Sequence, residues 1–369
     1  MIHLSTLLAE SKLKLNLPSD IKKIYKLFKK NGKQLYVVGG AVRDAILGKS
    51  PKDFDLATDA KPDEVLDIAK KGGFKTVEVG KSFGVVIVGG HEIATFRKDI
   101  GKGRRPDAVD FTDIQGDVKR RDLTINALFY DIGKKQIVDL VGGIADLKKK
   151  KIRTVGNAEE RFDEDPLRKL RALRFTGLLK GRMGKNTWEA LKRNPSITGV
   201  SGERIRDEFI KGIQKSKSVP QYFKMIKTLG MFKQILPGLS ILNRKLNTND
   251  YKLQIAYMLQ TNGADKVKRQ LNSLKYTNQE VHDIWLLIHM SRPAEVIKDL
   301  PTFKKLQSNS KLTTSQIKEW DKINSTKYVS QLWNWKLSVS PKDAISKGMK
   351  GKQIGDYLKD KEEELFLKK

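Results

Sequence analysis

The most informative stretch of the sequence is Leu35-Tyr-Val-Val-Gly-Gly-Ala-Val-Arg-Asp-Ala-Ile-Leu-Gly48. Its first four residues are β-branched, aromatic or aliphatic, its two glycines signal a turn, and its second half has helix-forming composition. A strand, tight turn and helix start predict an anion site, because a helix N-terminus presents unpaired N–H groups and glycine lets a ligand approach the backbone. Arg43, one turn into the helix, adds a planar donor fork for a phosphate. We therefore predict that Gly39, Gly40 and Arg43 bind nucleotide phosphates.

A second short run, Lys52-Asp-Phe-Asp-Leu56, follows this stretch almost at once. Asp53 and Asp55 alternate with two apolar residues, and alternate residues of a strand point to the same face. We therefore expect both carboxylates on one side of a strand, with Phe54 and Leu56 in the core. Two carboxylates beside a phosphate site can hold the Mg²⁺ ions that phosphoryl or nucleotidyl transfer needs. Asp53 and Asp55 are thus the predicted catalytic and metal-binding residues.

A P-loop is the main competing interpretation, since the chain has two Gly-Lys-Ser runs, at residues 48–50 and 80–82. That motif requires another glycine five residues earlier, and those positions hold Arg43 and Lys75. The spacing therefore excludes a P-loop. A lone Gly-Gly turn or a lone Asp-x-Asp pair would more often be a solvated turn, so the combination of the two carries the prediction.

The composition points to a polyanionic partner. Lys and Arg number 73 against 43 Asp and Glu, a formal net charge of +30. A generally lysine-rich proteome would give the same excess. The chain has no cysteine, which excludes disulfides and thiolate metal sites. No apolar run approaches the ~20 residues of a membrane helix, and no signal-peptide pattern opens the chain, so we expect a cytoplasmic protein without a membrane partner.

The Gly-Gly-x-Val-Arg-Asp run followed by Asp-x-Asp resembles the nucleotidyltransferase superfamily built on a polymerase-β-like catalytic domain. Within it the chain is similar to the bacterial-type group that contains tRNA CCA-adding enzymes and bacterial poly(A) polymerases. The resemblance and the order of expected strands and helices imply an α+β fold, in which a head with a small mixed sheet precedes a helical neck, body and tail. We place the head at residues 1–147, the neck at 148–212, and the RNA-binding body and tail at 213–369.

The run Lys119-Arg-Arg-Asp-Leu-Thr-Ile-Asn-Ala-Leu-Phe129 is predicted to be a helix, which would place Asp122 and Asn126 one turn apart on one face. A solvated helix start is the plain alternative for its arginines. The run resembles the family's Arg-Arg-Asp-x-x-x-Asn-Ala motif, which implies that Arg121 and Asp122 lie near the triphosphate and ribose of the incoming nucleotide. We therefore include Arg121, Asp122 and Asn126 among the nucleotide-binding residues.

Residues 161–175 form the second informative stretch. Pro166 suits a first helical position, with Asp165 before it as a natural N-cap. Arginines recur at every third position beside a stripe of leucines, so one stripe can pack while the other meets phosphate or base. These arginines are Arg168, Arg171 and Arg174. The run matches the family's Glu-Asp-x-x-Arg motif, which implies that Asp165 and Arg168 hydrogen-bond the incoming base in place of a template; capping alone is the alternative for Asp165.

These features favour a Mg²⁺-dependent, template-independent RNA nucleotidyltransferase that completes the 3′ CCA end of tRNA from CTP and ATP. Poly(A) polymerase is the nearest alternative, and Ser82 argues against it because paired basic residues are typical of those enzymes at this point. The Gly-rich, basic segment at residues 98–106 is expected to be a mobile loop. In the family this loop is implicated in the switch from C to A addition, and its shortness leaves CC-only or A-only addition open. Intact Asp53 and Asp55 argue against a non-catalytic RNA-binding protein.

Overall fold

The segments that carry the glycines and the carboxylates meet at the centre of a seven-stranded sheet. In the computed structural model, which describes residues 15–101, 108–242 and 246–369, the strand order is β3-β4-β5-β2-β1-β8-β9. Strand β1 (Leu35–Val38) pairs antiparallel with β2 (Asp55–Thr58) on one side and β8 (Leu128–Asp131) on the other. Strands β2 and β5 (His91–Thr95) run parallel. The sheet is therefore mixed, as predicted for an α+β head.

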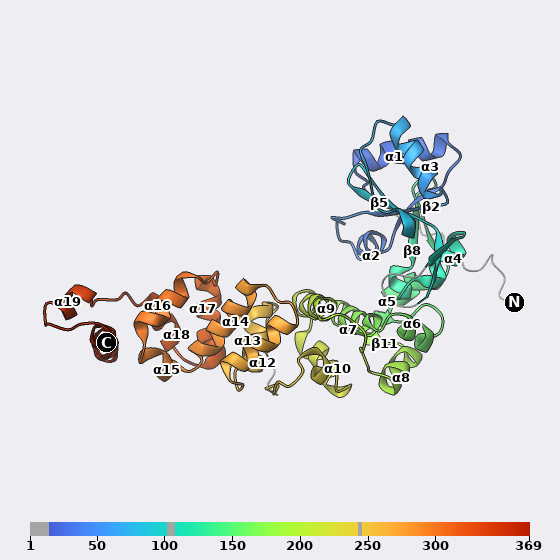
Figure 1. Ribbon diagram of the computed structural model, residues 1–369. Helices are drawn as coiled ribbons and strands as arrows, with labels where there is room; N and C mark the ends of the chain where they lie inside the picture. The colour runs from blue at the N-terminus through green and yellow to red at the C-terminus, as the bar shows by residue number, and fades with distance from the viewer. Residues whose placement is uncertain (1–14, 102–107, 243–245) are drawn as a thin grey trace. The chain divides into compact units, whose positions relative to one another are not determined.

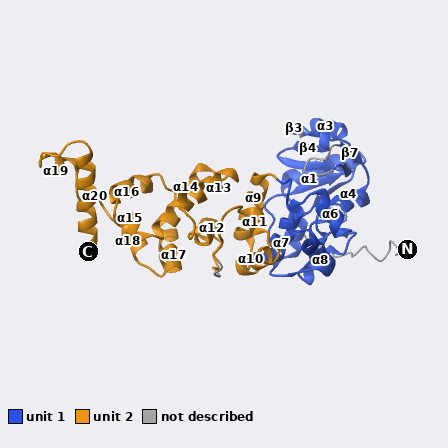
Figure 2. Ribbon diagram, turned by 60° about the horizontal axis from the view of Figure 1, so that its bottom comes forward, with its two compact units in different colours: residues 1–200 blue, residues 201–369 orange. Residues whose placement is uncertain are grey.

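The described residues divide into two compact units, residues 1–200 and 201–369 (Figure 2). Besides the four strands above, the first unit contains α1 (Ser19–Lys30), α2 (Gly40–Ile46), α3 (Pro62–Lys71), β3 (Thr76–Gly80), the 3-10 helix η2 (Lys81–Phe83), β4 (Val85–Val88), β6 (Arg97–Ile100), β7 (Ala108–Phe111), α4 (Ile114–Arg120), the 3-10 helix η3 (Thr124–Asn126), β9 (Gln136–Asp139), α5 (Gly143–Lys148), β10 (Lys151–Ile152), α6 (Ala158–Glu164), α7 (Leu167–Leu179), β11 (Arg182–Met183) and α8 (Lys185–Arg193). Helices α1 and α3 pack side by side at the sheet (Figure 1).

The core below the β1–α2 turn is built from aromatic and small apolar side chains. Tyr36, Phe96 and Phe129 pack with ring centroids 5.9 to 6.2 Å apart, in tilted and edge-to-face arrangements that aromatic pairs prefer. They join a cluster of buried residues that includes Val38 and Ala57. Strand β1 lies inside the sheet, which explains why Leu35–Val38 is a continuous apolar run. The turn that follows β1 is therefore held on a rigid base.

Two elements predicted after β5 differ from the structure. The helix predicted for residues 119–129 is absent, because α4 ends at Arg120, Arg121 is extended, and the chain continues as η3 and β8. Leu123 instead forms a β-bridge with Thr154, which pulls the chain out of helical geometry. The loop predicted at residues 98–106 begins later than expected, since β6 pairs with β7 as an antiparallel hairpin. Residues 102–107 of that loop lie outside the described residues.

The second unit is helical in the part that the structure describes, as predicted. Its elements are α9 (Gly202–Lys215), α10 (Val219–Thr228), α11 (Phe232–Ile235), α12 (Tyr251–Leu259), α13 (Ala264–Ser273), α14 (Asn278–Met290), α15 (Pro293–Ile297), α16 (Leu300–Ser308), α17 (Thr314–Asn324), α18 (Tyr328–Asn334), α19 (Pro341–Ile345) and α20 (Lys352–Leu367). None of the helices in the described ranges is long and apolar enough to span a membrane. The division into head, neck, body and tail at residues 147 and 212 stays a prediction.

Candidate active site

The β1–α2 turn places two glycines at the end of the central strand. Gly39 has φ +68°, in the region that favours glycine, and its N–H donates to the carbonyl of Leu128 at 3.0 Å. Its own carbonyl accepts from the N–H of Arg43 at 3.1 Å, which starts α2. The predicted strand, turn and helix start are thus confirmed. The Arg43 side chain is carried by α2 back towards η3, where its Nη1 donates to Asn126 Oδ1 at 2.7 Å.

The two predicted catalytic carboxylates lie directly beside this turn. Asp55 is the first residue of β2 and pairs with Val38, the residue before Gly39. Asp53 precedes the strand, so the prediction that both lie within it was wrong by two residues. The alternation nevertheless holds, because both aspartates are exposed whereas Phe54 and Leu56 are buried. Both carboxylates therefore face solvent at the edge of the turn.

The Asp53 and Asp55 carboxylates make no hydrogen bond or ion pair with any residue that the structure describes. Desolvation by the surrounding protein raises the pKa of Asp55; Arg121 opposes this and Asp53 adds to it. Two accessible carboxylates that repel each other and lack a protein cation are suited to a divalent metal ion. Among the described residues no group of three or more His, Cys, Asp or Glu could hold a metal, so this pair would depend on substrate oxygens to complete a coordination shell.

A chain of hydrogen bonds joins the α2 arginine to helix α7. Asn126 accepts from Arg43 and donates through Nδ2 to Asp122 Oδ1 at 3.3 Å. Asp122 Oδ2 in turn accepts from Arg171 Nε at 2.7 Å. Burial would raise the pKa of Asp122, but Arg171 and the hydrogen bonds to its carboxylate hold that pKa below its usual range. Asp122 thus stays ionised and orients Arg171; a contact between Asp122 and ribose stays a prediction.

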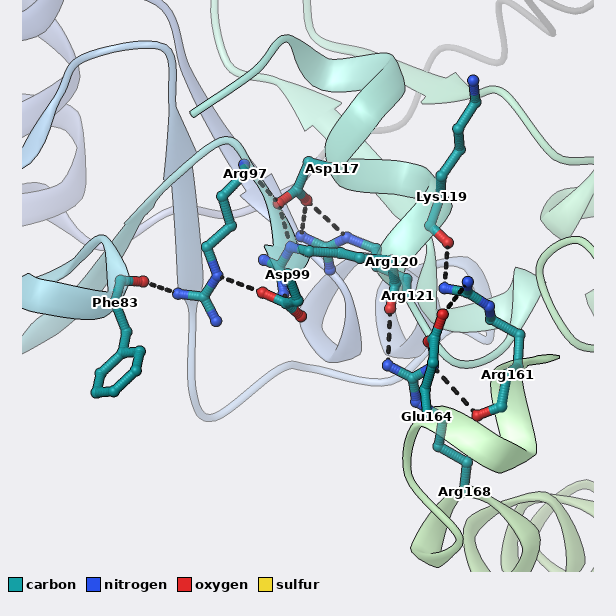
Figure 3. Close-up of polar contacts among 10 residues, drawn as sticks. All are labelled: Phe83, Arg97, Asp99, Asp117, Lys119, Arg120, Arg121, Arg161, Glu164 and Arg168. Carbon is teal, nitrogen blue, oxygen red and sulfur yellow. Dashed lines mark hydrogen bonds and ion pairs between the residues drawn. The ribbon is translucent and has the colours of Figure 1, made fainter. Parts of the chain in front are cut away.

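Sequence reasoning missed Asp117, which anchors the arginines at the end of α4 (Figure 3). Its carboxylate is 1% exposed and accepts from Arg120 Nε at 2.7 Å and from Arg121 Nη2 at 2.9 Å. Burial opposes ionisation, yet the two guanidinium groups, Arg121 first, keep the pKa of Asp117 below its usual range. The sequence could have indicated these contacts, because an aspartate three and four residues before two arginines predicts ion pairs on one face of a helix.

The predicted base-selecting residues lie where α6 passes into α7. Asp165 is the C-cap of α6 and Pro166 is the N-cap of α7, so the predicted cap lies one residue later than expected; the Asp165 Oδ1 still accepts from the N–H of Leu167 at 3.2 Å. The Arg168 guanidinium donates to Glu164 Oε2 at 2.6 Å and to the carbonyl of Arg120 at 2.9 Å (Figure 3). Arg168 is therefore oriented by the last turn of α4.

The structure brings most of the predicted nucleotide-binding residues into one group. The members joined by the contacts above, or by shared contact with the Phe175 ring, are Gly39, Gly40, Arg43, Arg121, Asp122, Asn126, Arg171 and Arg174. Arg168 joins this group through the carbonyl of Arg120, and its N–H donates to the carbonyl of Asp165 at 2.9 Å. An exposed carboxylate pair beside a group of arginines is the arrangement expected of the nucleotidyltransferase class of site, in which cations face the phosphates of a nucleotide.

Comparison with known proteins agrees with that class. Residues 35–153 match the family described as poly(A) polymerase head domain, and residues 182–242 match the family described as "probable RNA and SrmB-binding site of polymerase A". The chain is 42% identical over 219 residues to the CCA-adding enzyme of Bacillus licheniformis, and 42% identical over 207 residues to that of Ligilactobacillus salivarius. The first match covers 57% of this chain and 53% of the relative, so the chain matches about half the length of such relatives.

Solved structures are similar over nearly the whole chain. The Bacillus stearothermophilus CCA-adding enzyme in complex with CTP has a TM-score of 0.64 at 24% identity, covering 95% of this chain and 93% of that one. The Thermotoga maritima CCA-adding enzyme complexed with tRNA has a TM-score of 0.67 at 21% identity, covering 98% and 94%. These likenesses show the fold. The predicted resemblance is confirmed: the two matched domains span residues 35–153 and 182–242, and the relatives and solved structures reported above are CCA-adding enzymes.

Proposed function

We propose that this protein is a template-independent RNA nucleotidyltransferase that completes the 3′ CCA end of tRNA from CTP and ATP and releases pyrophosphate. The observation that carries the proposal is the free carboxylate pair, Asp53 and Asp55, set against the end of β1 beside a group of arginines. The names of the relatives at about 42% identity support CCA addition in particular. A cytoplasmic location, as expected from the sequence, stays a prediction.

Asp53 and Asp55 would hold Mg²⁺, which supplies activation of the RNA 3′-hydroxyl and neutralises the triphosphate. The Gly39–Gly40 turn and the Arg43 guanidinium would receive phosphate oxygens. Arg121, held by Asp117 and with its guanidinium 4.6 Å from the centre of the Phe129 ring, lies close enough to influence the Asp55 carboxylate. These residues would place the α-phosphate near the carboxylates and stabilise the charge that develops as pyrophosphate leaves.

Base choice would come from the α6–α7 junction. An aspartate can accept from the amino group of C or A, and an arginine can donate to the ring acceptors of the same base. Asp165 and Arg168 supply this pair, and Glu164 with the carbonyl of Arg120 would hold Arg168 in a fixed direction. A pyrimidine such as U offers a carbonyl at this position, from which the Asp165 carboxylate has nothing to accept.

One assay separates this proposal from its alternatives. A tRNA transcript that ends before the CCA is supplied with CTP, ATP or both in the presence of Mg²⁺, and the products are resolved by single nucleotides. Two additions with CTP, and three but no more with both, are the expected result. Long A tails on tRNA and unrelated RNA would identify a poly(A) polymerase instead. Arrest after two C residues, or A addition only to ends that already carry CC, would identify a partial activity.

A further inference from the structure

Three arginines from two helices converge on the ring of Phe175 in α7. The ring is 3% exposed, and the guanidinium carbons of Arg43, Arg171 and Arg174 lie 5.0, 5.9 and 4.1 Å from its centroid. Arg171 and Arg174 belong to the same helix as the ring. Arg43 comes from α2, which is more than a hundred residues away in the chain and carries the Gly-Gly turn at its start. One buried aromatic side chain thus connects the turn to the arginine stripe of α7.

A ring orients a guanidinium in a way that a carboxylate cannot. A cation over an aromatic ring is attracted by the ring's quadrupole, and that contact uses none of the five in-plane N–H donors of an arginine. The ring therefore competes with none of the polar contacts of these arginines: Arg43 donates to Asn126 and Asp44, and Arg171 donates through its Nε to Asp122. A carboxylate in place of Phe175 would instead occupy the donors and cancel positive charge.

Arginines gathered in one place also repel one another, and this repulsion has to be offset. Each contact with an aromatic ring is worth ~0.5 to 2 kcal/mol, and the larger values apply to desolvated contacts such as that of the buried Arg174. Without the ring, the arginine side chains would lower their mutual repulsion by moving apart into solvent, since an arginine has many rotamers. The Phe175 ring therefore favours a gathered arrangement before any ligand arrives.

We propose that Phe175 is a positioning residue, whose ring gathers Arg43, Arg171 and Arg174 so that they receive the triphosphate of the incoming nucleotide. The inference rests on the proposed function, because it assigns the triphosphate to this group of arginines. It goes further in giving the apolar core of α7 a task in nucleotide affinity. It also predicts which measured quantity changes: the binding of triphosphate weakens, while the binding of RNA does not.

The test compares Phe175→Leu and Phe175→Met, which keep an apolar side chain but remove the ring, with Phe175→Tyr, which keeps the ring. Phe28→Leu is the matched control, since Phe28 is fully buried in α1 of the same unit. The measurements are the dissociation constant of inorganic tripolyphosphate with Mg²⁺ by calorimetry, KM and kcat for CTP on a tRNA transcript that ends before the CCA, and the affinity for that transcript.

We expect Phe175→Leu and Phe175→Met to weaken tripolyphosphate binding and raise KM for CTP by about tenfold, the loss of one to two such contacts. Phe175→Tyr should restore both values to within about threefold of wild type, and transcript affinity should not change. Unchanged tripolyphosphate binding in folded Phe175→Leu and Phe175→Met, or an equal loss in Phe28→Leu, would overturn the proposal. If the wild-type chain binds tripolyphosphate but extends no RNA, the proposed function fails while the calorimetric comparison still decides the role of the ring.

Discussion

Two pairs of aspartates in the first unit differ completely in their surroundings. Asp53 and Asp55, at the start of β2, face solvent and have no protein cation bound to them. Around the end of α4, Asp117 is buried and Asp122 is half-buried, and each holds one or more arginines. The pKa of Asp55 is raised, whereas the pKa values of Asp117 and Asp122 are lowered. Aspartate side chains are thus accessible to a metal ion at the start of β2, whereas around the end of α4 they hold arginines in place.

The largest expected effect comes from the solvent-facing pair, Asp53 and Asp55. Asp55→Asn should lower nucleotide addition by about a thousandfold, because a metal ion contributes several kcal/mol of transition-state stabilisation. Because the folded state raises the pKa of Asp55, its ionised form destabilises the fold at neutral pH, and this cost disappears in acid. The thermal midpoint of Asp55→Asn at neutral pH should therefore equal or exceed that of wild type. Retained turnover in the variant would remove Asp55 from the metal site.

The aspartates that hold arginines should respond in the opposite way. Asp117→Asn should lower the free energy of unfolding by about 3 kcal/mol at pH 7, since it leaves the half-buried guanidinium groups of Arg120 and Arg121 without their buried counter-charge. The folded state lowers the pKa of Asp117, so its stabilisation is complete above the usual carboxyl range and is lost as the pH falls through the folded-state pKa. Urea unfolding of both proteins at pH 7 and at pH 3 measures the difference.

The control for Asp117 is Asp63→Asn. Asp63 pairs with Lys81, but its side chain is 81% exposed, and exposed pairs contribute little to stability. We expect this variant to stay within about 0.5 kcal/mol of wild type at both pH values. A loss in Asp63→Asn as large as that in Asp117→Asn would mean that burial is not what separates the two groups of carboxylates.

The smallest expected effect concerns Asp165, which combines features of both groups: it is buried, yet it is proposed to contact substrate. Asp165→Ser keeps a capping oxygen for the N–H of Leu167, so the unfolding midpoint should hardly change. Misincorporation of U or G should rise roughly ten- to hundredfold, because a good base contact is worth ~1 to 3 kcal/mol of discrimination. Competition assays with mixed nucleotides would show wild-type selectivity if Asp165 only capped α7.

Sequence reasoning succeeded where the decisive contacts are local. The β1–α2 turn follows from two adjacent glycines, the first of which has positive φ, and the exposed Asp53 and Asp55 follow from alternation with buried neighbours. The mixed sheet and the helical second unit were also readable from periodicity. The turn and the alternation of the aspartates depend on residues that are close together in the chain.

It failed where a distant segment overrides the local pattern. Asp122 and Asn126 have helical spacing, but Leu123 bridges Thr154 and the N–H of Thr124 donates to the carbonyl of Arg153 at 2.9 Å. The two polar side chains still meet at 3.3 Å, although no helix joins them. The contact of Arg43 with Phe175 likewise depends on tertiary packing of α2 and α7, for which the local sequence holds no signal.

The double pairing of Val38 has a consequence for how this chain can change in evolution. Val38 is opposite Asp55 in β2 and opposite Phe129 in β8, so one residue aligns the carboxylates and the segment that carries Asn126 with the Gly39 turn. Inserting or deleting a single residue in β1 would shift the turn against both neighbours at once and reverse the side-chain faces of the strand. Strands β6 and β7 form a separate two-stranded sheet, so a change of length in this hairpin would not disturb that alignment. Length variation among relatives should therefore concentrate in the hairpin and be absent from β1.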